Sequence, residues 1–194
     1  MSGKTRAAIF ISGRGSNMMA LVEAAREPDF PAEFALVVSN DPAAAGLEWA
    51  AKQGIKTLAV DHRPFKGDRE AHERIIDAEL RAAGIAFICL AGYMRILTPW
   101  LVEQWQGRMI NIHPALLPEF KGLHTHERAI AAEAVEHGAT VHWVTPGVDE
   151  GEIILQARVP VLKDDTAEVL AARVLNEEHR LYPAAVRKVL APHA

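Results

Sequence analysis

The chain has 194 residues, of which 49% are hydrophobic and 24% are charged, and its formal net charge at pH 7 is −4. This length and apolar content suffice to bury one sizeable core, so we expect a single domain over residues 1–194. The acidic balance, the lack of a basic cluster and the 6% of aromatic residues argue against a nucleic-acid surface, and no apolar run is long enough to cross a bilayer.

The single cysteine bears on the compartment. Cys89 lies inside the apolar run 86–91, so an intrachain disulfide is impossible and a buried thiol is the simplest interpretation. The N-terminal residues lack the long apolar segment of a signal peptide. We therefore expect a cytoplasmic protein with neither nucleic acid nor membrane among its partners.

The first half of the chain alternates apolar runs with segments of helical spacing. Four apolar runs predict strands: 7–11, 34–39, 55–60 and 85–91. Three segments between them predict helices: 18–26, 43–53 and 69–83. This alternation predicts an α/β fold with a Rossmann-like, open and mostly parallel sheet that carries helices on both faces. Ligands of such sheets bind beyond the carboxyl ends of the strands.

A glycine loop joins the first predicted strand to the first predicted helix. Gly13 and Gly15 are followed by Ser16 and Asn17, which places flexible backbone and hydroxyl and amide groups at a helix N-terminus. Free N–H groups there can hold an anion, so Gly15, Ser16 and Asn17 are candidates to bind one phosphate monoester. A dinucleotide site would want a third glycine where Met18 stands. The alternative is a tight turn that needs glycines for its shape alone.

An unusually apolar loop, residues 92–97, follows the fourth strand and precedes Thr98-Pro99, a predicted helix start. Met94, Ile96 and Leu97 can either wall a flat aromatic ligand or pack under the next helix. Arg95 is either a solvated charge or an anion clamp.

The segment 109–113 predicts a strand whose last residues are the candidate catalytic centre. Asn111 and His113 are two positions apart and therefore share a face, whereas Ile112 points to the opposite layer. Pro114 disfavours helical geometry at His113, so the chain stays extended up to the histidine and then leaves the sheet. A neutral donor and a titratable imidazole thus stand side by side, and the alternative is an ordinary polar strand end.

The remaining elements complete the sheet. We expect a helix over 127–136 ended by His137-Gly138, and a long amphipathic helix over 166–190 with Thr166 as N-cap and a break near Pro183. Two further segments predict strands: 140–144 and 153–161. The loop 145–151 lies between them and carries Asp149, either a functional carboxylate or ordinary turn chemistry.

Three histidines, His113, His124 and His126, raise a metal hypothesis. We expect no metal, because a His-x-His pair in a loop lacks the four-residue helical spacing of the familiar zinc motif and no cysteine cluster supports it.

Four segments together closely resemble the phosphoribosylglycinamide formyltransferases, a family of folate-dependent enzymes of purine synthesis: 12–17, 91–97, 111–118 and 122–126. The resemblance continues through 141–144 and Asp149 to 178–183, nearly the whole chain in the same order. It implies transfer of the formyl group of 10-formyltetrahydrofolate to the amine of glycinamide ribonucleotide through a tetrahedral intermediate, without a metal.

The resemblance also implies roles for residues. Asn111, His113 and Asp149 would form the catalytic trio. The nucleotide would be held by two groups of residues: Gly15, Ser16 and Asn17 at the phosphate, and Leu175, Asn176, Glu177 and Glu178 elsewhere. The folate would be received by these residues: Arg69, Met94, Arg95, Ile96, Leu97, Asn111, Thr145, Pro146, Gly147, Val148 and Asp149. Residues 1–108 would be the phosphate-binding half and 109–194 the catalytic and folate-binding half of a monomer or weak homodimer.

Three residues depart from the family pattern: Lys121 stands where proline is common, and Glu150 and Glu152 where glycine and proline are common. They leave the trio intact but alter the shape and charge expected for the folate loop. Four alternatives to this function are a 10-formyltetrahydrofolate hydrolase, a formyltransferase that acts on charged tRNA, a nucleotide-binding regulatory module without activity, and a metal-dependent hydrolase built on His113, His124 and His126. The phosphate loop argues against the first and the acidic charge against the second.

Overall fold

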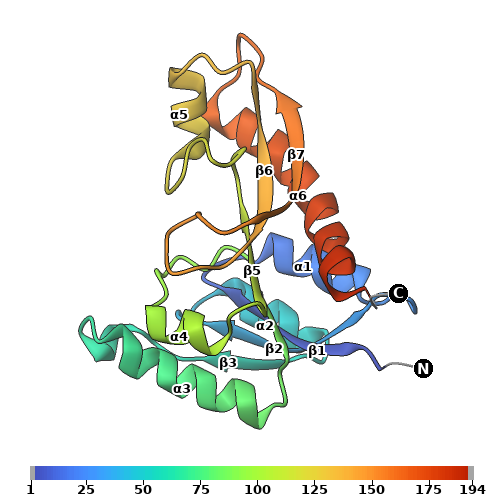
Figure 1. The fold of residues 1–194 in the computed structure, drawn as a ribbon, viewed down its shortest axis with the longest axis vertical. Coiled ribbons are helices and arrows are strands. Elements are labelled where there is room, and N and C mark those ends of the chain that lie inside the picture. Colours follow the sequence, from blue (N-terminus) through green and yellow to red (C-terminus); the bar gives the residue numbers. More distant parts are fainter. Residues whose placement is uncertain (1–2, 192–194) are drawn as a thin grey trace.

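The structure is a computed structural model that describes residues 3–191. These residues form one open seven-stranded sheet in the order β3-β2-β1-β4-β5-β6-β7, with helices on both faces (Figure 1). The strands are β1 (Thr5–Ile11), β2 (Ala32–Ser39), β3 (Lys56–Ala59), β4 (Phe87–Leu90), β5 (Met109–His113), β6 (Glu136–Trp143) and β7 (Ile153–Pro160). The helices are α1 (Ser16–Ala24), α2 (Ala45–Lys52), a 3₁₀ turn η1 (Arg63–Phe65), α3 (Arg69–Ala82), α4 (Pro99–Gln104), α5 (Thr125–Ala131) and α6 (Ala167–Leu190).

The pairing is parallel from β3 through β5 and antiparallel at β5–β6 and β6–β7. The predicted Rossmann-like, mostly parallel α/β fold is therefore confirmed. Because β6 and β7 form a hairpin beside β5, they extend the sheet past the βα units, and Figure 1 shows them with α5 and the start of α6 at the end away from α3.

Two apolar layers cover the sheet. In β1, Ala7, Ile9 and Ile11 pack with α1, α2 and α6, whereas Ala8 and Phe10 pack with α3 and α4. Successive strand residues point to opposite faces, and both faces are covered here, so residues 7–11 of β1 form an unbroken apolar run.

The expected helix over 127–136 is wrong at its C-terminal end. Helix α5 ends at Ala131, Glu133 takes the left-handed conformation (φ 50°), and Glu136 already begins β6. Gly138 lies in the β6–β7 ladder, where a Cβ would collide with the backbone oxygen of Ala157. Residues 136–138, whose local pattern predicted the end of a helix, are thus part of strand β6.

The expected break at Pro183 does not occur, because α6 runs without interruption to Leu190. Its neighbour Tyr182 is fully buried and donates its hydroxyl hydrogen towards the backbone oxygens of Leu90 (2.8 Å) and Ile110 (3.2 Å). These bonds tie α6 to the last residue of β4 and to the second residue of β5, next to the position where Pro183 lacks a backbone N–H.

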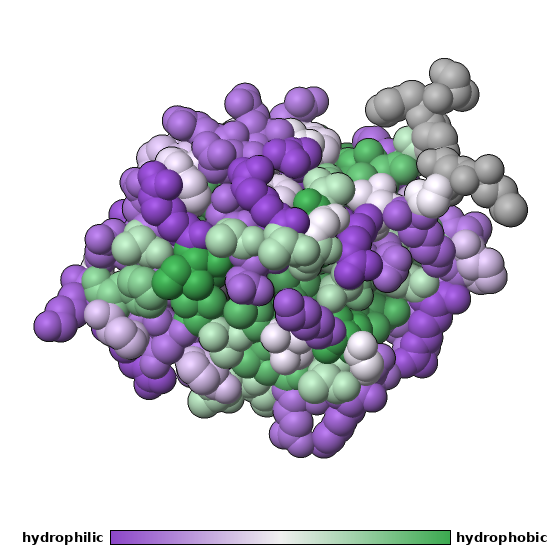
Figure 2. Space-filling model, turned by 90° about the horizontal axis from the view of Figure 1, so that it is seen from below, coloured by the Kyte–Doolittle hydropathy of each residue, from purple (hydrophilic) through white to green (hydrophobic). Residues whose placement is uncertain are grey.

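The face opposite the hairpin end mixes hydrophilic residues with an irregular band of hydrophobic ones (Figure 2). Within residues 3–191, no helix has both the length and the apolar character required to cross a membrane.

Candidate active site

Strand β5 presents the two predicted catalytic side chains on one face. Ile110 and Ile112 enter the core layer beneath α6, while Asn111 and His113 point the other way. His113 is 6% exposed and Asn111 is half-buried. The predicted sharing of a face is confirmed, and the burial shields both groups from water.

His113 is held between two acceptors. Its Nδ1 lies 3.3 Å from Oδ2 of Asp149, and its Nε2 lies 3.0 Å from the backbone oxygen of Phe120. A neutral imidazole can donate at only one nitrogen, whereas the charged form donates at both. The geometry therefore suits an imidazolium beside the Asp149 carboxylate.

Asp149 reaches His113 from the loop between β6 and β7. It adopts a left-handed backbone conformation (φ 53°), which Asp tolerates better than most residues, and Oδ2 accepts the N–H of Gly122 at 3.0 Å. Burial raises the pKa of Asp149, but the His142 side chain, the Gly122 N–H and the charge of His113 outweigh that effect, and the pKa is lowered overall. Asp149 is thus a carboxylate near neutral pH.

Sequence reasoning missed a fourth polar member, His142. It is 3% exposed and stands opposite Asn111 in the β5–β6 pairing. Its Nε2 lies 3.3 Å from the amide nitrogen of Asn111 and 3.6 Å from Oδ1 of Asp149, and its Nδ1 lies 2.9 Å from the backbone oxygen of Trp143. With Nδ1 turned to the Trp143 oxygen, Nε2 faces both the Asn111 amide and the Asp149 carboxylate, and it fixes the direction of that amide.

The glycine loop forms the mouth of a cavity of about 300 Å³. Its lining is Ser12, Gly13, Arg14, Gly15, Ser16, Asn17, Ala91, Gly92 and Met94. Helix α1 starts at Ser16 without a side-chain cap, after Gly15 in the left-handed conformation (φ 71°), so its first N–H groups lack helical acceptors and are available to an anion.

Gly46, at the start of α2, supports this loop and was also missed. Its N–H donates to the backbone oxygen of Gly13 at 3.0 Å, and a Cβ on Gly46 would lie 2.9 Å from the backbone oxygen of Arg14. Only glycine permits this approach, which holds the loop 13–14 in place.

Asn17 links the loop to α6. Its Nδ2 donates to Oε2 of the buried Glu178 at 3.3 Å, and its buried Oδ1 has no partner among the described residues. Burial raises the pKa of Glu178 to about 7, although the bond from Asn17 opposes the shift. Of the other predicted nucleotide contacts, Asn176 is exposed, Leu175 is half-buried, and Glu177 pairs with Arg180 at 3.0 Å.

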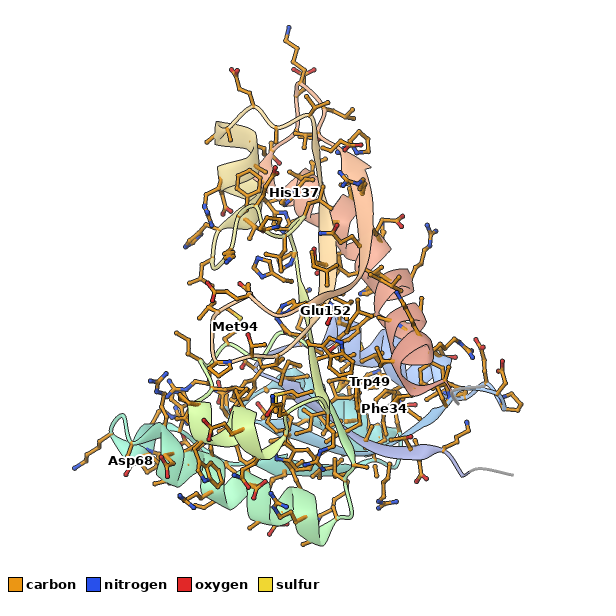
Figure 3. The ribbon with its side chains drawn as sticks, viewed as in Figure 1. Phe34, Trp49, Asp68, Met94, His137 and Glu152 are labelled. Atoms are coloured by element: carbon orange, nitrogen blue, oxygen red, sulfur yellow. The ribbon has the colours of Figure 1, made fainter. Side chains whose placement is uncertain are left out.

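The loop 92–97 divides its apolar side chains between the two roles considered for it. Leu97 is buried in the layer with α4, whereas Met94 and Ile96 are 66% and 61% exposed. Arg69 donates to the backbone oxygen of Ile96 at 3.1 Å, so this predicted folate residue lies against the loop, while Arg95 is half-buried. In Figure 3, Met94 appears just below the loop that joins β6 to β7.

In that loop, residues 145–151, Val148 is 49% exposed, whereas Gly151 is buried and the Asp149 side chain is only 10% exposed. Two of the departures from the family pattern meet beside it, because Nζ of Lys121 lies 3.1 Å from Oε1 of Glu150. The same loop begins with Thr145 and Pro146, which are exposed, and Gly147, which is half-buried.

Two other histidines, His126 and His137, form a separate pair above the site. His126 Nδ1 lies 3.2 Å from Nε2 of His137, which is labelled in Figure 3, while His124 is an exposed neighbour of Glu127. Burial and the neighbouring His126 lower the pKa of His137 to about 4, so it is neutral near pH 7. No group of three or more His, Cys, Asp or Glu side chains that could hold a metal ion occurs in the part of the chain that the structure describes.

Comparison with known proteins agrees with this geometry. Residues 5–186 match the family model described as formyl transferase. The trifunctional purine biosynthetic protein adenosine-3 of Bos taurus is 46% identical over 96% of this chain, which spans only 18% of that protein's length. The phosphoribosylglycinamide formyltransferase of Haemophilus influenzae is 40% identical over 93% of this chain and 84% of its own.

A solved structure is similar over almost the full length. The crystal structure of phosphoribosylglycinamide formyltransferase from Brucella melitensis superposes with a TM-score of 0.92 and 51% identity over 98% of each chain. This chain therefore belongs to the formyl transferase family, in the branch of the phosphoribosylglycinamide formyltransferases.

Proposed function

We propose that this chain transfers the formyl group of 10-formyltetrahydrofolate to the amine of glycinamide ribonucleotide, a step of purine biosynthesis. The observation that carries the proposal is the approach of the His113 imidazole to the Asp149 carboxylate at 3.3 Å, with Asn111 on the same strand face. A donor pair next to a carboxylate is what formyl transfer to an amine requires.

The chemistry assigns each member a task. The amine nitrogen attacks the formyl carbon, the new C–N bond forms, and negative charge gathers on the formyl oxygen. The Asn111 amide donates to that oxygen, and His113 donates to it the Nε2–H that otherwise goes to the backbone oxygen of Phe120, while Nδ1 stays on Asp149. As the tetrahedral intermediate collapses, the bond to N10 of the folate breaks, and N10 takes up a proton while the amine loses one.

The nucleotide occupies the cavity at the glycine loop. Gly15, Ser16 and Asn17 hold its phosphate through the free N–H groups of α1 and through polar side chains. Glu178, with Leu175, Asn176 and Glu177 nearby on α6, holds the rest of the nucleotide, because the unpartnered Oδ1 of Asn17 and the buried carboxyl can accept and donate to hydroxyl groups.

The folate lies between two loops. Arg69 and the segment Met94, Arg95, Ile96 and Leu97 form one wall, and Thr145, Pro146, Gly147, Val148 and Asp149 form the other. The exposed side chains of Met94, Ile96 and Val148 supply apolar surface for a flat ring system. Residues 1–108 thus provide the phosphate site and one folate wall, and residues 109–194 the trio and the second wall of a monomer or weak homodimer.

Two further points complete the proposal. No metal takes part, because a proton donor and an amide already serve the formyl oxygen. A reducing cytoplasm is the expected compartment, since the only thiol, Cys89, is fully buried and its pKa is raised by burial.

The experiment is an absorbance assay for deformylated folate with purified protein and 10-formyltetrahydrofolate, with and without glycinamide ribonucleotide. Product that appears only with the nucleotide is the expected result. Product without nucleotide would instead indicate a 10-formyltetrahydrofolate hydrolase. Absence of product in both reactions would contradict both activities and direct attention to charged tRNA.

A further inference from the structure

One side chain joins the phosphate loop to the apolar loop 92–97. Ser12 is the first residue after β1, and its Oγ accepts the backbone N–H of Met94 at 2.8 Å. The same hydroxyl donates its single hydrogen to Oδ1 of Asn40 at 2.5 Å. Ser12 therefore donates to Asn40, which follows β2, and accepts from Met94 in the loop after β4.

Asn40 keeps the hydroxyl in this orientation. The His62 ring lies against Asn40, with Nδ1 2.9 Å from the Asn40 backbone oxygen and 3.2 Å from Nδ2, and the amide oxygen of Asn40 faces Ser12. Asn40 is 5% exposed and Ser12 is half-buried, which protects both bonds from competition by water. The bond to Met94 is thus a defined contact rather than one of several that a free hydroxyl could make.

The loop 92–97 is fixed at two other points. The Tyr93 ring packs edge-on against Phe10 with centroids 5.2 Å apart, and Arg69 holds the backbone oxygen of Ile96. The bond to Ser12 fixes the backbone of Met94 between these anchors, whereas the Met94 side chain is 66% exposed and remains able to contact a ligand.

We propose that Ser12 is a positioning residue that couples the phosphate subsite to the folate subsite; the inference rests on the function proposed above. Both subsites share a cavity wall, because Ser12, Gly15 and Met94 line the same cavity. An anion bound at Gly15 to Asn17 restricts the loop that begins at Ser12, and through Ser12 it restricts Met94. Because the bound anion has already ordered the loop 92–97, folate binding loses less conformational entropy there. The two ligands therefore bind with positive cooperativity.

The test measures hydrogen exchange at the Met94 amide and ligand affinity in wild type and in Ser12→Ala. Without ligand, hydrogen exchange at the Met94 amide should be about fivefold faster in Ser12→Ala, because the variant lacks one ordinary hydrogen bond to that amide. Inorganic phosphate or glycinamide ribonucleotide should slow this exchange in wild type and leave it nearly unchanged in the variant. The affinity for 5,8-dideazafolate, which carries no formyl group, should rise several-fold with nucleotide in wild type alone.

Two variants separate the hydroxyl from packing. Ser12→Thr keeps the hydroxyl and should keep the coupling. Ser39→Ala removes a hydroxyl at the end of the adjacent strand β2, where it bonds to the backbone of Asp41, and should leave Met94 exchange unchanged.

Three results would overturn the proposal: equal Met94 exchange in wild type and Ser12→Ala, equal ligand-induced protection in the two proteins, or a loss in Ser12→Thr as large as in Ser12→Ala. Failure of the proposed function looks different. In that case phosphate still slows Met94 exchange through Ser12, but no formyl transfer to the nucleotide is detected.

Discussion

Asn111 and His142 occupy opposite positions of the β5–β6 pairing, and the amide nitrogen of Asn111 lies 3.3 Å from Nε2 of His142. The same nitrogen of His142 lies 3.6 Å from Asp149, so one ring faces two members of the trio. His142 does not itself need to touch the substrate. It sets the direction of the Asn111 amide and adds to the contacts that lower the pKa of Asp149.

Replacing His142 by Ala should therefore lower kcat about five- to thirtyfold and change the KM for glycinamide ribonucleotide little. The loss corresponds to one or two hydrogen bonds, about 1 kcal/mol each. His142→Gln, whose side-chain oxygen can accept from Asn111, should recover part of kcat. Steady-state kinetics of the three proteins check this, and a wild-type kcat in His142→Ala would show that Asn111 needs no such partner.

The trio should respond more strongly. His113→Ala, Asn111→Ala and Asp149→Ala should each lower turnover at least about tenfold, because loss of one oxyanion donor typically costs about a hundred- to a thousandfold in rate. Affinity for the nucleotide, measured by titration calorimetry, should stay near the wild-type value, since the phosphate site proposed above lies at the start of α1. Near-wild-type turnover in any variant would remove that residue from the trio.

The fold and most of the site could be predicted from the sequence because both depend on local patterns. Apolar runs covered on both faces predict parallel strands, and parallel strands bring their carboxyl ends to one edge. The meeting of Ser12, Asn40 and Met94 follows from that rule.

What was missed depends on pairing between distant segments. His142 became visible only when β6 was known to lie antiparallel beside β5 in a definite register. Gly46 looked like any helical glycine until its distance to the Arg14 backbone was known. The end of α5 was misplaced because the ladder with β7 recruits His137 and Gly138, which a single-segment pattern cannot indicate.

Glu178 should make stability depend on pH. Burial raises its pKa to about 7, whereas an unfolded Glu titrates near 4.5, so between these values the folded state binds more protons than the unfolded state. The free energy of unfolding should accordingly fall as pH rises from about 4.5 to 7, by roughly 3 kcal/mol at most.

Glu178→Gln should abolish this contribution to the pH dependence of the free energy of unfolding. Urea unfolding curves of the variant and the wild type at several pH values measure the difference. Glu177→Gln is the matched control, because Glu177 pairs with Arg180 on the same helix. If the wild-type and Glu178→Gln stabilities run parallel over this pH range, Glu178 is not the titrating group.

Gly46→Ala should raise the KM for the nucleotide several-fold and lower stability. Its Cβ would press on the backbone of Gly13 and Arg14, and backbone cannot yield as a flexible side chain can. Ala45→Gly is the control, because it weakens the same helix end by up to about 1 kcal/mol without crowding the loop. Thermal unfolding and the KM for the nucleotide together check this. Equal KM values in the two variants would show that Gly46 does not support nucleotide binding through the glycine loop.

The ion pair between Lys121 and Glu150 should have a small, salt-dependent effect on kcat. It lies next to the bond from Gly122 to Asp149, so it ties together the two loops that hold the Asp149 carboxylate. Both side chains are substantially exposed, 40% and 58%, which limits the pair to about 0.2–1 kcal/mol. Lys121→Glu and Glu150→Lys should each lower kcat less than about tenfold, through like-charge repulsion across the loops.

The double variant with both charges exchanged should recover most of the lost kcat at low ionic strength, because the attraction is restored with reversed polarity. The single-variant losses should shrink in 0.5 M salt, where exposed charges are screened. If the exchanged variant is as slow as the worse single variant, the side chains act through packing or substrate contact, and the pair does not position Asp149. Recovery with the predicted salt dependence would mean that the ion pair between Lys121 and Glu150 sets the shape of the loops around the Asp149 carboxylate.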